Sequence, residues 1–570
     1  MLGQMRTRRV AILAAIIACL AFWLFWNRPR HANMAEYVPA ESLAFVEVND
    51  LPEFADGIVN TDAWKALSSP AGATLNFPYG RWLIGLARWT GIGSAETVLL
   101  ARSQFAISWM DVSQNEVGTT LAVKPVGALV IETHTTQLRM RPVFEKKIEE
   151  LVHRKYREAQ LQHKIIGEAD FFEWSTPDGK PQIVFAFVGS VGIIGNDERP
   201  VQACLLVRNG ERPGLNSSEV FNMLRTGTET SNRLGTFGFL SPSGIKKVIP
   251  YLPELVGRYS DSSNVVQLLA NVAASLTNGI GWMPSFVNGA VEDHLTYLLA
   301  DGVAQKLRDG VAPEQPAALK FVELLPADTK SFTQYNFRQP AEAWRGLNAA
   351  ISLHVDVVSS IIARRVLLGA LANYGIENPD TFLASIGPEI STVRLSNSTS
   401  PIVIGQVLDA AMLSKQLREH LGPGPSVERV GEAEISVSTD SKRGAISLLG
   451  NEFLMGSAED LRRSLEAQRT SNTIARNDSF RRAQQLLNPS ALTTAVTFSS
   501  DESDAISFVS LFSSGRNEAL PEKADALREA RKYLPYAVKT TQFNEIAFTQ
   551  TSRSSFGIAG SLLVRLFPGD

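Results

Sequence analysis

Ser243 and Lys246 form the residue pair in this 570-residue chain whose types and spacing most suggest chemistry. A serine followed three residues later by a lysine occurs in serine enzymes whose lysine amine can accept the proton of the nucleophilic hydroxyl. The chain contains no Lys-Thr-Gly motif to complete such a site, and a pattern this short arises readily by chance. A serine hydrolase is therefore the least favoured hypothesis, and we predict no catalytic residues.

Metal and cofactor chemistry is not indicated by any motif. The seven histidines are His31, His134, His153, His163, His294, His354 and His420. None lies four residues from another, the spacing that places two ligands on one face of a helix. A Walker loop, a dinucleotide fingerprint, an HExxH motif, paired CxxC motifs and a nucleophile elbow are also absent. The sequence therefore predicts no metal, no cofactor and no enzymatic activity.

Two glycines, Gly192 and Gly195, precede residues that are typical of a helix start. The side-chain oxygens of Asn196 and Asp197 can accept hydrogen bonds from the unpaired amides of a first helical turn. Such a turn can bind phosphate, but this glycine spacing fits neither the P-loop nor the dinucleotide pattern. We therefore expect a structural turn here.

These glycines belong to residues 165–206, which predict an antiparallel unit followed by a helix. Residues 171–176 and 182–188 are apolar or alternate with polar residues. The Pro-Asp-Gly-Lys sequence at 177–180 favours a tight turn between them. A short strand at 191–194 then leads into the helix.

A second stretch, residues 429–465, resembles the first. Gly431 follows Gly167 by 264 residues (431 − 167), and Gly456 follows Gly195 by 261 residues (456 − 195). The register thus drifts by only three residues across the unit. A chance match would not keep register so well, so the sequence predicts an internal duplication.

Other segments match at similar spacing. Pro39 and Pro326 open the two copies 287 residues apart (326 − 39), each before an alternating strand. Trp64 and Trp344 follow in helix-like stretches, where we expect them to pack in the core and not to bind a ligand.

A pair of strands is expected to close each copy. We match residues 278–282 with residues 544–548, and residues 295–299 with residues 562–566. The match implies that both copies end in the same kind of antiparallel strand pair.

These matches divide the chain into two repeats, residues 36–300 and residues 321–570. Residues 301–320, which contain two glycines and two prolines, are predicted to link them. The hairpins and closing strand pairs are antiparallel, although helices are interspersed with them. The predicted fold class is therefore α+β, with two tandem copies of a mainly antiparallel sheet covered by helices, behind an N-terminal transmembrane helix.

The amino terminus predicts a membrane anchor. Residues 10–26 form an uninterrupted apolar run, which would extend about 26 Å as a helix. Three arginines precede this run and two follow it, a bias that favours the amino end inside the cell. We therefore expect residues 1–9 in the cytoplasm, residues 10–26 as a retained single-pass signal-anchor of the inner membrane, and residues 27–35 as a tether. The body would lie in the periplasm or outside the cell.

An alternative for this segment is lipidation at Cys19, because the Ile-Ile-Ala-Cys sequence at residues 16–19 resembles a lipobox. The apolar run continues past Cys19 to Trp26, which favours retention of the whole anchor over cleavage. Cys204 is the only other cysteine, so no disulfide can form within the body. A net charge of −3 indicates no polyanion-binding surface, and we expect no nucleic-acid partner.

The Pro-Ala-acid openings (residues 39–41 and 326–328) and the Gly-Glu-Ala segments (167–169 and 431–433) resemble the bacterial family known as domain of unknown function 3352. The resemblance covers most of residues 36–570. It implies an amino-terminal membrane segment with a large extracytoplasmic body in the bacterial envelope. It implies no activity, and no functional residues can be carried over.

The leading functional hypothesis from the sequence is a membrane-anchored binding or scaffold protein that is not an enzyme. Its basis is a duplicated unit with matched turns and core positions but without a matched polar cluster. The alternative is a carrier of lipid or another apolar ligand in the envelope, because sheets covered by helices can enclose an apolar groove. Expected partners are the membrane, through residues 10–26, and another envelope protein or a lipid.

Overall fold

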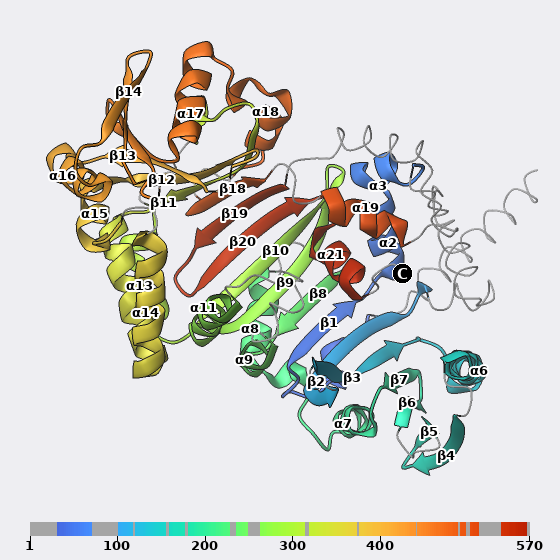
Figure 1. The fold of residues 1–570 in the computed structure, drawn as a ribbon. Helices are drawn as coiled ribbons and strands as arrows, with labels where there is room; N and C mark the ends of the chain where they lie inside the picture. Colours follow the sequence, from blue (N-terminus) through green and yellow to red (C-terminus); the bar gives the residue numbers. More distant parts are fainter. Residues whose placement is uncertain are drawn as a thin grey trace, which may run out of the picture.

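The computed structural model describes most of the body of the protein (Figure 1). The described residues are 31–70, 101–117, 120–155, 159–176, 181–228, 235–248, 263–313, 319–372, 376–398, 400–440, 442–487, 491–497, 502–511 and 537–566. The predicted cytoplasmic residues 1–9 and the predicted anchor at residues 10–26 lie outside this part. Within it, no helix is both long enough and apolar enough to cross a bilayer.

Ten described strands in residues 31–300, here called the N-terminal half, form one antiparallel sheet. They are β1 (Ala44–Val48), β2 (Gln104–Val117), β3 (Thr120–Glu132), β4 (Gln160–Ile166), β5 (Ala169–Ser175), β6 (Pro181–Val188), β7 (Val191–Gly195), β8 (Thr236–Leu240), β9 (Thr277–Val287) and β10 (Ala290–Leu299). Hydrogen-bonded neighbours follow the order β4-β5-β6-β7-β3-β2-β1-β8-β9-β10. The antiparallel pairing of β5 with β6 confirms the two strands predicted from residues 171–176 and 182–188, and the turn predicted at residues 177–180 lies outside the described residues.

In the C-terminal half, residues 319–566, the described residues form ten further strands. They are β11 (Thr329–Asn336), β12 (Ile386–Leu395), β13 (Ile402–Val407), β14 (Ser426–Val430), β15 (Ala433–Val437), β16 (Ala445–Leu449), β17 (Glu452–Gly456), β18 (Thr493–Thr497), β19 (Ala537–Phe543) and β20 (Ala547–Ser554). Their order is β14-β15-β16-β17-β13-β12-β11-β18-β19-β20. Each strand in this order occupies the place of the strand numbered ten lower in the first half.

The two halves join where β10 pairs with β20 in the middle of the sheet (Figure 1). His294 pairs with Thr551 near the centre of this contact. His294 lies opposite Met283 in the β9–β10 hairpin, and Thr551 lies opposite Thr540 in the β19–β20 hairpin, so each is equally far from its hairpin turn. The pairing makes one continuous 20-stranded sheet, which confirms the α+β class with a large antiparallel sheet.

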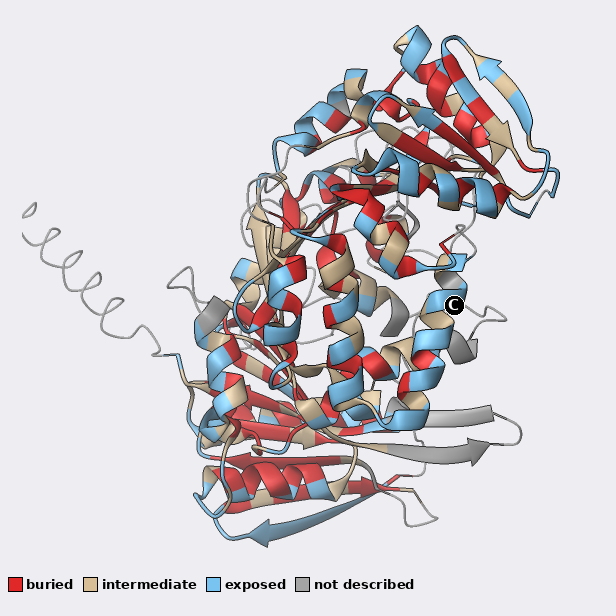
Figure 2. Cartoon of the chain, turned by 90° about the vertical axis from the view of Figure 1, so that its left-hand side faces the viewer, coloured by how far each residue is buried: buried red, intermediate tan, exposed pale blue. Residues whose placement is uncertain are grey.

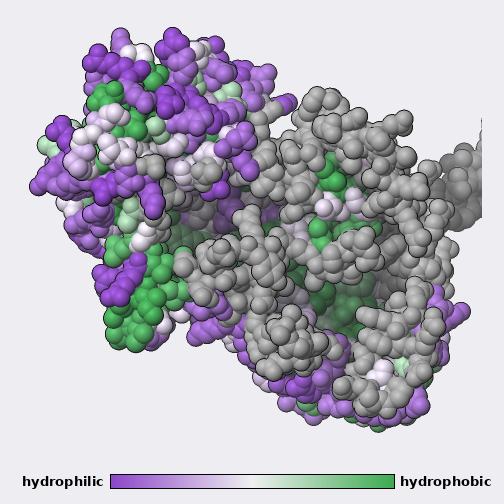
Figure 3. All heavy atoms as spheres, in the orientation of Figure 1, coloured by the Kyte–Doolittle hydropathy of each residue, from purple (hydrophilic) through white to green (hydrophobic). Residues whose placement is uncertain are grey.

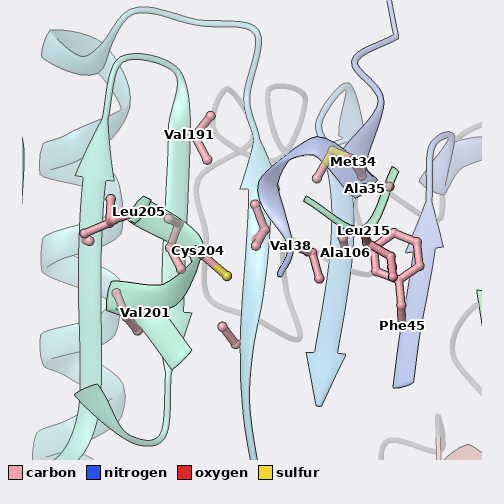
Figure 4. Close-up of a cluster of buried hydrophobic side chains, with 14 of the residues drawn as sticks. Met34, Ala35, Val38, Phe45, Ala106, Val191, Val201, Cys204, Leu205 and Leu215 are labelled. Atoms are coloured by element: carbon pink, nitrogen blue, oxygen red, sulfur yellow. The ribbon is translucent and has the colours of Figure 1, made fainter. Parts of the chain in front are cut away.

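Helices cover both faces of the sheet in the N-terminal half. They are η1 (Met34–Tyr37), α2 (Leu51–Val59), α3 (Asp62–Leu67), α6 (Gln137–Lys155), α7 (Glu198–Arg208), η2 (Leu215–Ser217), α8 (Glu219–Thr228), α9 (Pro242–Val248) and α11 (Ser263–Ser275). On one face, Phe45, Phe171 and Cys204 are buried with η1, α7 and α8 (Figure 4). On the other, Phe172 and Phe185 pack against α6. Alternate residues of β5 and β6 thus serve two cores.

The helices of the C-terminal half, together with α12 from the segment that connects the halves, make the same two layers. They are α12 (Val303–Val311), η4 (Val322–Leu324), α13 (Pro340–His354), α14 (Val357–Ala372), α15 (Pro379–Ser385), α16 (Ala410–Leu421), α17 (Ala458–Thr470), η5 (Ile474–Arg476), α18 (Asp478–Gln484), α19 (Glu502–Ser510) and α21 (Gly557–Leu566). Leu454 packs with α17 and α18 on one face, whereas Phe453 and Met455 pack with α15 and α16 on the other. Of the two tryptophans predicted to pack in the core, Trp64 is buried in α3, against Phe508 and Phe556, whereas Trp344 of α13 is only partly buried.

The ends of the sheet are β4 and β14. Every residue of β4 is exposed (Figure 2), although the next strand inward, β5, is largely buried. The turns beside these strands are held by glycines in the left-handed region, where a side chain would be strained: φ is 61° at Gly167 and 62° at Gly431. These are the two glycines whose 264-residue spacing indicated a repeat.

Two sequence predictions are corrected by the structure. Residues 562–566 belong to helix α21 and not to a closing strand. The closing pair of the second half is the β19–β20 hairpin, and Asn544 lies in its turn. Residues 301–320, predicted as a linker, include helix α12, whose Val303, Leu307 and Val311 are buried.

Candidate functional site

The main candidate for a binding site is an apolar cavity of about 550 Å³ at the junction of the two halves. One wall is the sheet, with residues from β10 and β11 and from β18, β19 and β20. The other wall consists of helices α11, α12 and α13, together with Leu383 of α15. The volume is within the range of cavities that hold small molecules.

Its lining is almost entirely hydrophobic. Leu276, Tyr297 and Leu299 come from the N-terminal half, and Tyr335, Trp344 and Phe548 come from the C-terminal half. No lining residue in the described part of the chain is charged. Among the described lining residues, the polar side-chain groups are the hydroxyls of two tyrosines and three threonines and the indole N–H of Trp344, and burial raises the pKa of the Tyr297 hydroxyl. The cavity suits an apolar ligand with few hydrogen-bonding groups.

Helices α12 and α13 are held in place by two glycines. A Cβ at Gly310 of α12 would lie 2.0 Å from the backbone nitrogen of Ala343, and a Cβ at Gly346 of α13 would lie 2.2 Å from the carbonyl oxygen of Lys306. The helix backbones therefore touch at both points, which only glycine permits. This contact positions Leu307 and Trp344 over the cavity.

A buried polar cluster lies elsewhere in the N-terminal half, where the chain enters the sheet. Gln104 Nε2 donates to Asn49 Oδ1 (2.5 Å) and to the carbonyl oxygen of Ala32 (2.9 Å). The fully buried Glu47 lies 2.8 Å from Nη2 of Arg225. Burial raises the pKa of Glu47 to about 7, although the charge of Arg225 opposes this rise.

A corresponding cluster lies in the C-terminal half. Gln334 Nε2 donates to Asn336 Oδ1 (2.8 Å), and Gln334 Oε1 accepts from the backbone nitrogen of Lys320 (2.8 Å). The Lys320 amine lies 2.8 Å from Oε1 of Glu389. Gln334 and Asn336 follow Glu47 and Asn49 by the same 287 residues (334 − 47 and 336 − 49) that separate the opening prolines.

The acid and the amide have exchanged places between these two clusters. Gln104 precedes Phe105, which pairs with Val48, and Glu389 precedes Ile390, which pairs with Tyr335. Thus the acid of the N-terminal cluster, Glu47, lies on β1, the first strand of its half. The acid of the C-terminal cluster, Glu389, lies on β12, the second strand of its half. The expectation that the copies share no polar cluster was wrong. The sequence carried a signal for it, because Glu-Val-Asn at residues 47–49 aligns with Gln-Tyr-Asn at residues 334–336.

The serine and lysine of the hydrolase hypothesis are both exposed on the short helix α9. The hydroxyl of Ser243 lies 3.0 Å from that of Ser241, which also accepts from the Gly244 backbone nitrogen. Among the described residues, no hydrogen bond connects Ser243 to Lys246. The local arrangement is that of a helix start, where serine hydroxyls satisfy backbone amides.

We therefore expect no serine-directed labelling of this protein. Incubation of the full chain with a fluorophosphonate probe should leave it unmodified, because none of the described residues is a base hydrogen-bonded to the Ser243 hydroxyl. Labelling is read by intact-mass spectrometry. Modification that disappears in a Ser243→Ala variant would contradict this expectation and restore the hydrolase hypothesis.

The histidines do not assemble into a metal site. His134 Nε2 lies 2.9 Å from Gln104 Oε1, and the ring of His163 stacks on Phe172 and lies 3.1 Å from Asp170 Oδ1. His354 and His420 contact backbone carbonyl oxygens. Within the described ranges, no three His, Cys, Asp or Glu side chains are grouped so that they could hold an ion.

The glycine pair before α7 is explained by packing. A Cβ at Gly195 would lie 2.6 Å from Cγ2 of Val201, so glycine permits the close approach of β7 and α7. Asp197 caps the helix by accepting from the Arg199 backbone nitrogen, and Asn196 Nδ2 donates to the carbonyl oxygen of Pro125. This geometry agrees with the structural turn expected from the sequence.

Comparison with known proteins adds no assignment: no family model, no curated protein and no solved structure matches the chain.

Proposed function

We propose that the protein is a non-enzymatic binding protein that carries a lipid or another apolar ligand in the cavity between its two halves. The cavity is the observation that carries this proposal. It is large enough for a small molecule or part of an acyl chain, and the described residues that line it are mostly apolar and carry no charge. Because both halves contribute to its walls, the ligand site exists only in the assembled two-half chain.

The cavity favours the carrier over a scaffold without a ligand, which was the leading hypothesis from the sequence. A scaffold needs surfaces for partners but has no use for an apolar cavity, since apolar surface left in contact with water costs free energy. The two polar clusters do not favour an enzyme. They lie where residues 32 and 320 enter the sheet, and their hydrogen bonds fix those segments.

We infer that the two halves arose by tandem duplication of one α+β module. The inference is supported by the same strand order in both halves and by the matching φ angles of Gly167 and Gly431. It is also supported by one isolated bridge at the start of each half, Pro39 with Gly214 and Pro326 with Thr473. Duplication would explain why a ligand site lies at the seam, where two copies of the closing hairpin meet.

We further propose that the body works at a membrane surface. The support is the apolar run at residues 10–26 with its flanking arginines, which would hold the body at the outer face of the bacterial inner membrane. A carrier in that position has direct access to lipids. The resemblance to domain of unknown function 3352 is consistent with this location.

The carrier proposal is tested by filling the cavity. Thr541 lines it from β19, and a Thr541→Trp substitution would occupy space that an apolar ligand needs. We expect the purified full chain to retain about tenfold less of a specific lipid than the unaltered protein, as measured by mass spectrometry of extracted lipids.

The matched control is Thr549→Trp. Thr549 follows the cavity residue Phe548 in β20 and therefore faces the opposite side of the sheet. Lipid held around residues 10–26 would be the same in both variants, so only the cavity ligand would differ. Equal lipid contents in both folded variants and in the unaltered protein would overturn the carrier proposal.

A further inference from the structure

The first half of helix α14 presents an apolar surface to solvent. Val357 is 75% exposed, Val358 65%, Ile361 49% and Ile362 47%, and the neighbouring Leu353 of α13 is 56% exposed. Figure 3 shows this region as a hydrophobic patch over α13 and α14. The five residues, here called the α14 patch, are large and adjacent, unlike the isolated apolar residues that occur on any protein surface.

The opposite side of α14 is already used for packing. Ala363 and Leu367 pack with Val272 of α11 and Ile351 of α13. Because one side fills this core, the helix needs no apolar residues on its outer side. A helix that is apolar on both sides is expected inside a large core or in contact with lipid. The α14 patch is therefore a surface that lacks its partner among the described residues.

The charges beside the patch indicate the kind of partner. Arg364 and Arg365 are both exposed on α14, and the helix contains no acidic residue from Val357 to Ala372, although the exposed Asp356 directly precedes it and accepts from the Ser359 backbone nitrogen. Basic residues beside an apolar helix face are typical of helices that lie in the interface of an anionic bilayer. The arginines would meet phosphate groups while the valines and isoleucines enter the acyl region.

The same helix is next to the cavity. Leu276 and Leu347 line the cavity and also belong to the packing cluster that contains Ala363 of α14. These two side chains thus contact the cavity space on one side and the packing cluster of α14 on the other. A bilayer against the α14 patch would lie on the far side of this same wall.

We propose that α14 docks on the surface of an anionic phospholipid bilayer, with the α14 patch inserted among the lipids and Arg364 and Arg365 on their headgroups. This docking places the wall of the cavity against the source of its ligand. The proposal deepens the carrier function and rests on it for its purpose, but the contact itself needs no ligand in the cavity.

The test uses the full chain with a single fluorescent reporter. Cys19 is replaced by alanine, and Cys204 remains because it is fully buried, which raises its thiol pKa to about 12 and prevents labelling. A Val357→Cys variant carries an environment-sensitive nitrobenzoxadiazole label on the patch. Its matched control is a Glu459→Cys variant, labelled at an exposed position of α17.

Both labelled chains are reconstituted in vesicles of brominated phosphatidylcholine with about one third phosphatidylglycerol. We expect the label at position 357 to be quenched by the bromine atoms about fivefold more than the label at position 459, because only the patch enters the acyl region. Arg364→Gln together with Arg365→Gln, or vesicles without phosphatidylglycerol, should remove most of this difference, since the headgroup attraction is lost.

Equal quenching at both positions would overturn the docking proposal. So would a blue shift at position 357 that occurs in detergent without vesicles and grows with protein concentration, because a second copy of the chain would then be the partner. Neither result concerns the lipid content of the Thr541→Trp variant. The failure of docking can therefore be distinguished from the failure of the carrier function.

Discussion

A Gly310→Val variant is expected to lose about 3 kcal/mol of unfolding free energy and to release the cavity ligand. The substitution places atoms where the backbone of Ala343 already lies, since even a Cβ would be 2.0 Å from the Ala343 nitrogen. The backbone of α13 cannot move aside as a side chain could, so α12 and α13 must separate. Thermal or denaturant unfolding and lipid extraction would measure the two effects.

Gly369 of α14 offers a matched control for this prediction. A Cβ at this position would meet no atom within 4 Å, so Gly369→Ala should leave the ligand in place. It should stabilise the helix by up to about 1 kcal/mol, because glycine is a poor residue within helices. If Gly310→Val were as stable as Gly369→Ala and still bound lipid, the close contact of α12 and α13 would not determine the shape of the cavity.

A Glu47→Gln variant is expected to remove a pH dependence of stability worth up to about 3 kcal/mol. Burial raises the Glu47 pKa from 4.5 in the unfolded chain to about 7 in the folded one. The folded state therefore holds a proton that the unfolded state has released between these pH values. The stabilising contribution of protonated Glu47 is complete below pH 4.5 and is lost as the pH rises through 7.

The measurement compares urea unfolding of the two proteins from pH 4 to pH 8. The glutamine should gain relative stability as the pH rises, because it carries no charge to bury. Arg225 and Asn49 surround residue 47 in both proteins. Subtracting the unfolding free energies of the two proteins at each pH therefore removes the contribution of the other titrating groups. His134, near the same cluster, has a pKa lowered by burial, and its contribution is instead lost as the pH falls.

The second half provides the converse substitution. Gln334 occupies the place of Glu47 and is fully buried, so Gln334→Glu should introduce a loss of stability with rising pH. A pH-independent difference between Glu47→Gln and the unaltered protein would show that Glu47 stays charged throughout and is stabilised by Arg225.

Local patterns in the sequence predicted the elements that local chemistry determines. Glycines at turns, alternating strands and capping residues placed the paired strands β5 and β6 and the start of α7 correctly. Residues 562–566 were predicted as a strand because a short apolar run fits a strand as well as a buried helix. The start of helix α21 depends on a distant residue, since Asp293 accepts from the backbone nitrogen of Ile558.

The cavity could not be predicted, because its walls come from segments far apart in the chain. It requires the pairing of β10 with β20, for which the residues of either strand carry no separate signal. Helix α12 did have a signal: Val303, Leu307 and Val311 recur every four residues. Its glycines concealed this signal, since they suggested a flexible connection when Gly310 in fact permits close packing.

The seam between β10 and β20 has a consequence for the history of the fold. In its register, Asp293 pairs with Ser552 and Leu295 with Gln550, while His294 faces Thr551 at the centre. Exchanging the two hairpins reproduces the same set of pairs, so the contact is isologous. Under the proposed duplication, an ancestor with only one half would form a homodimer through this edge. Fusion of two genes would then have made permanent an assembly that already existed.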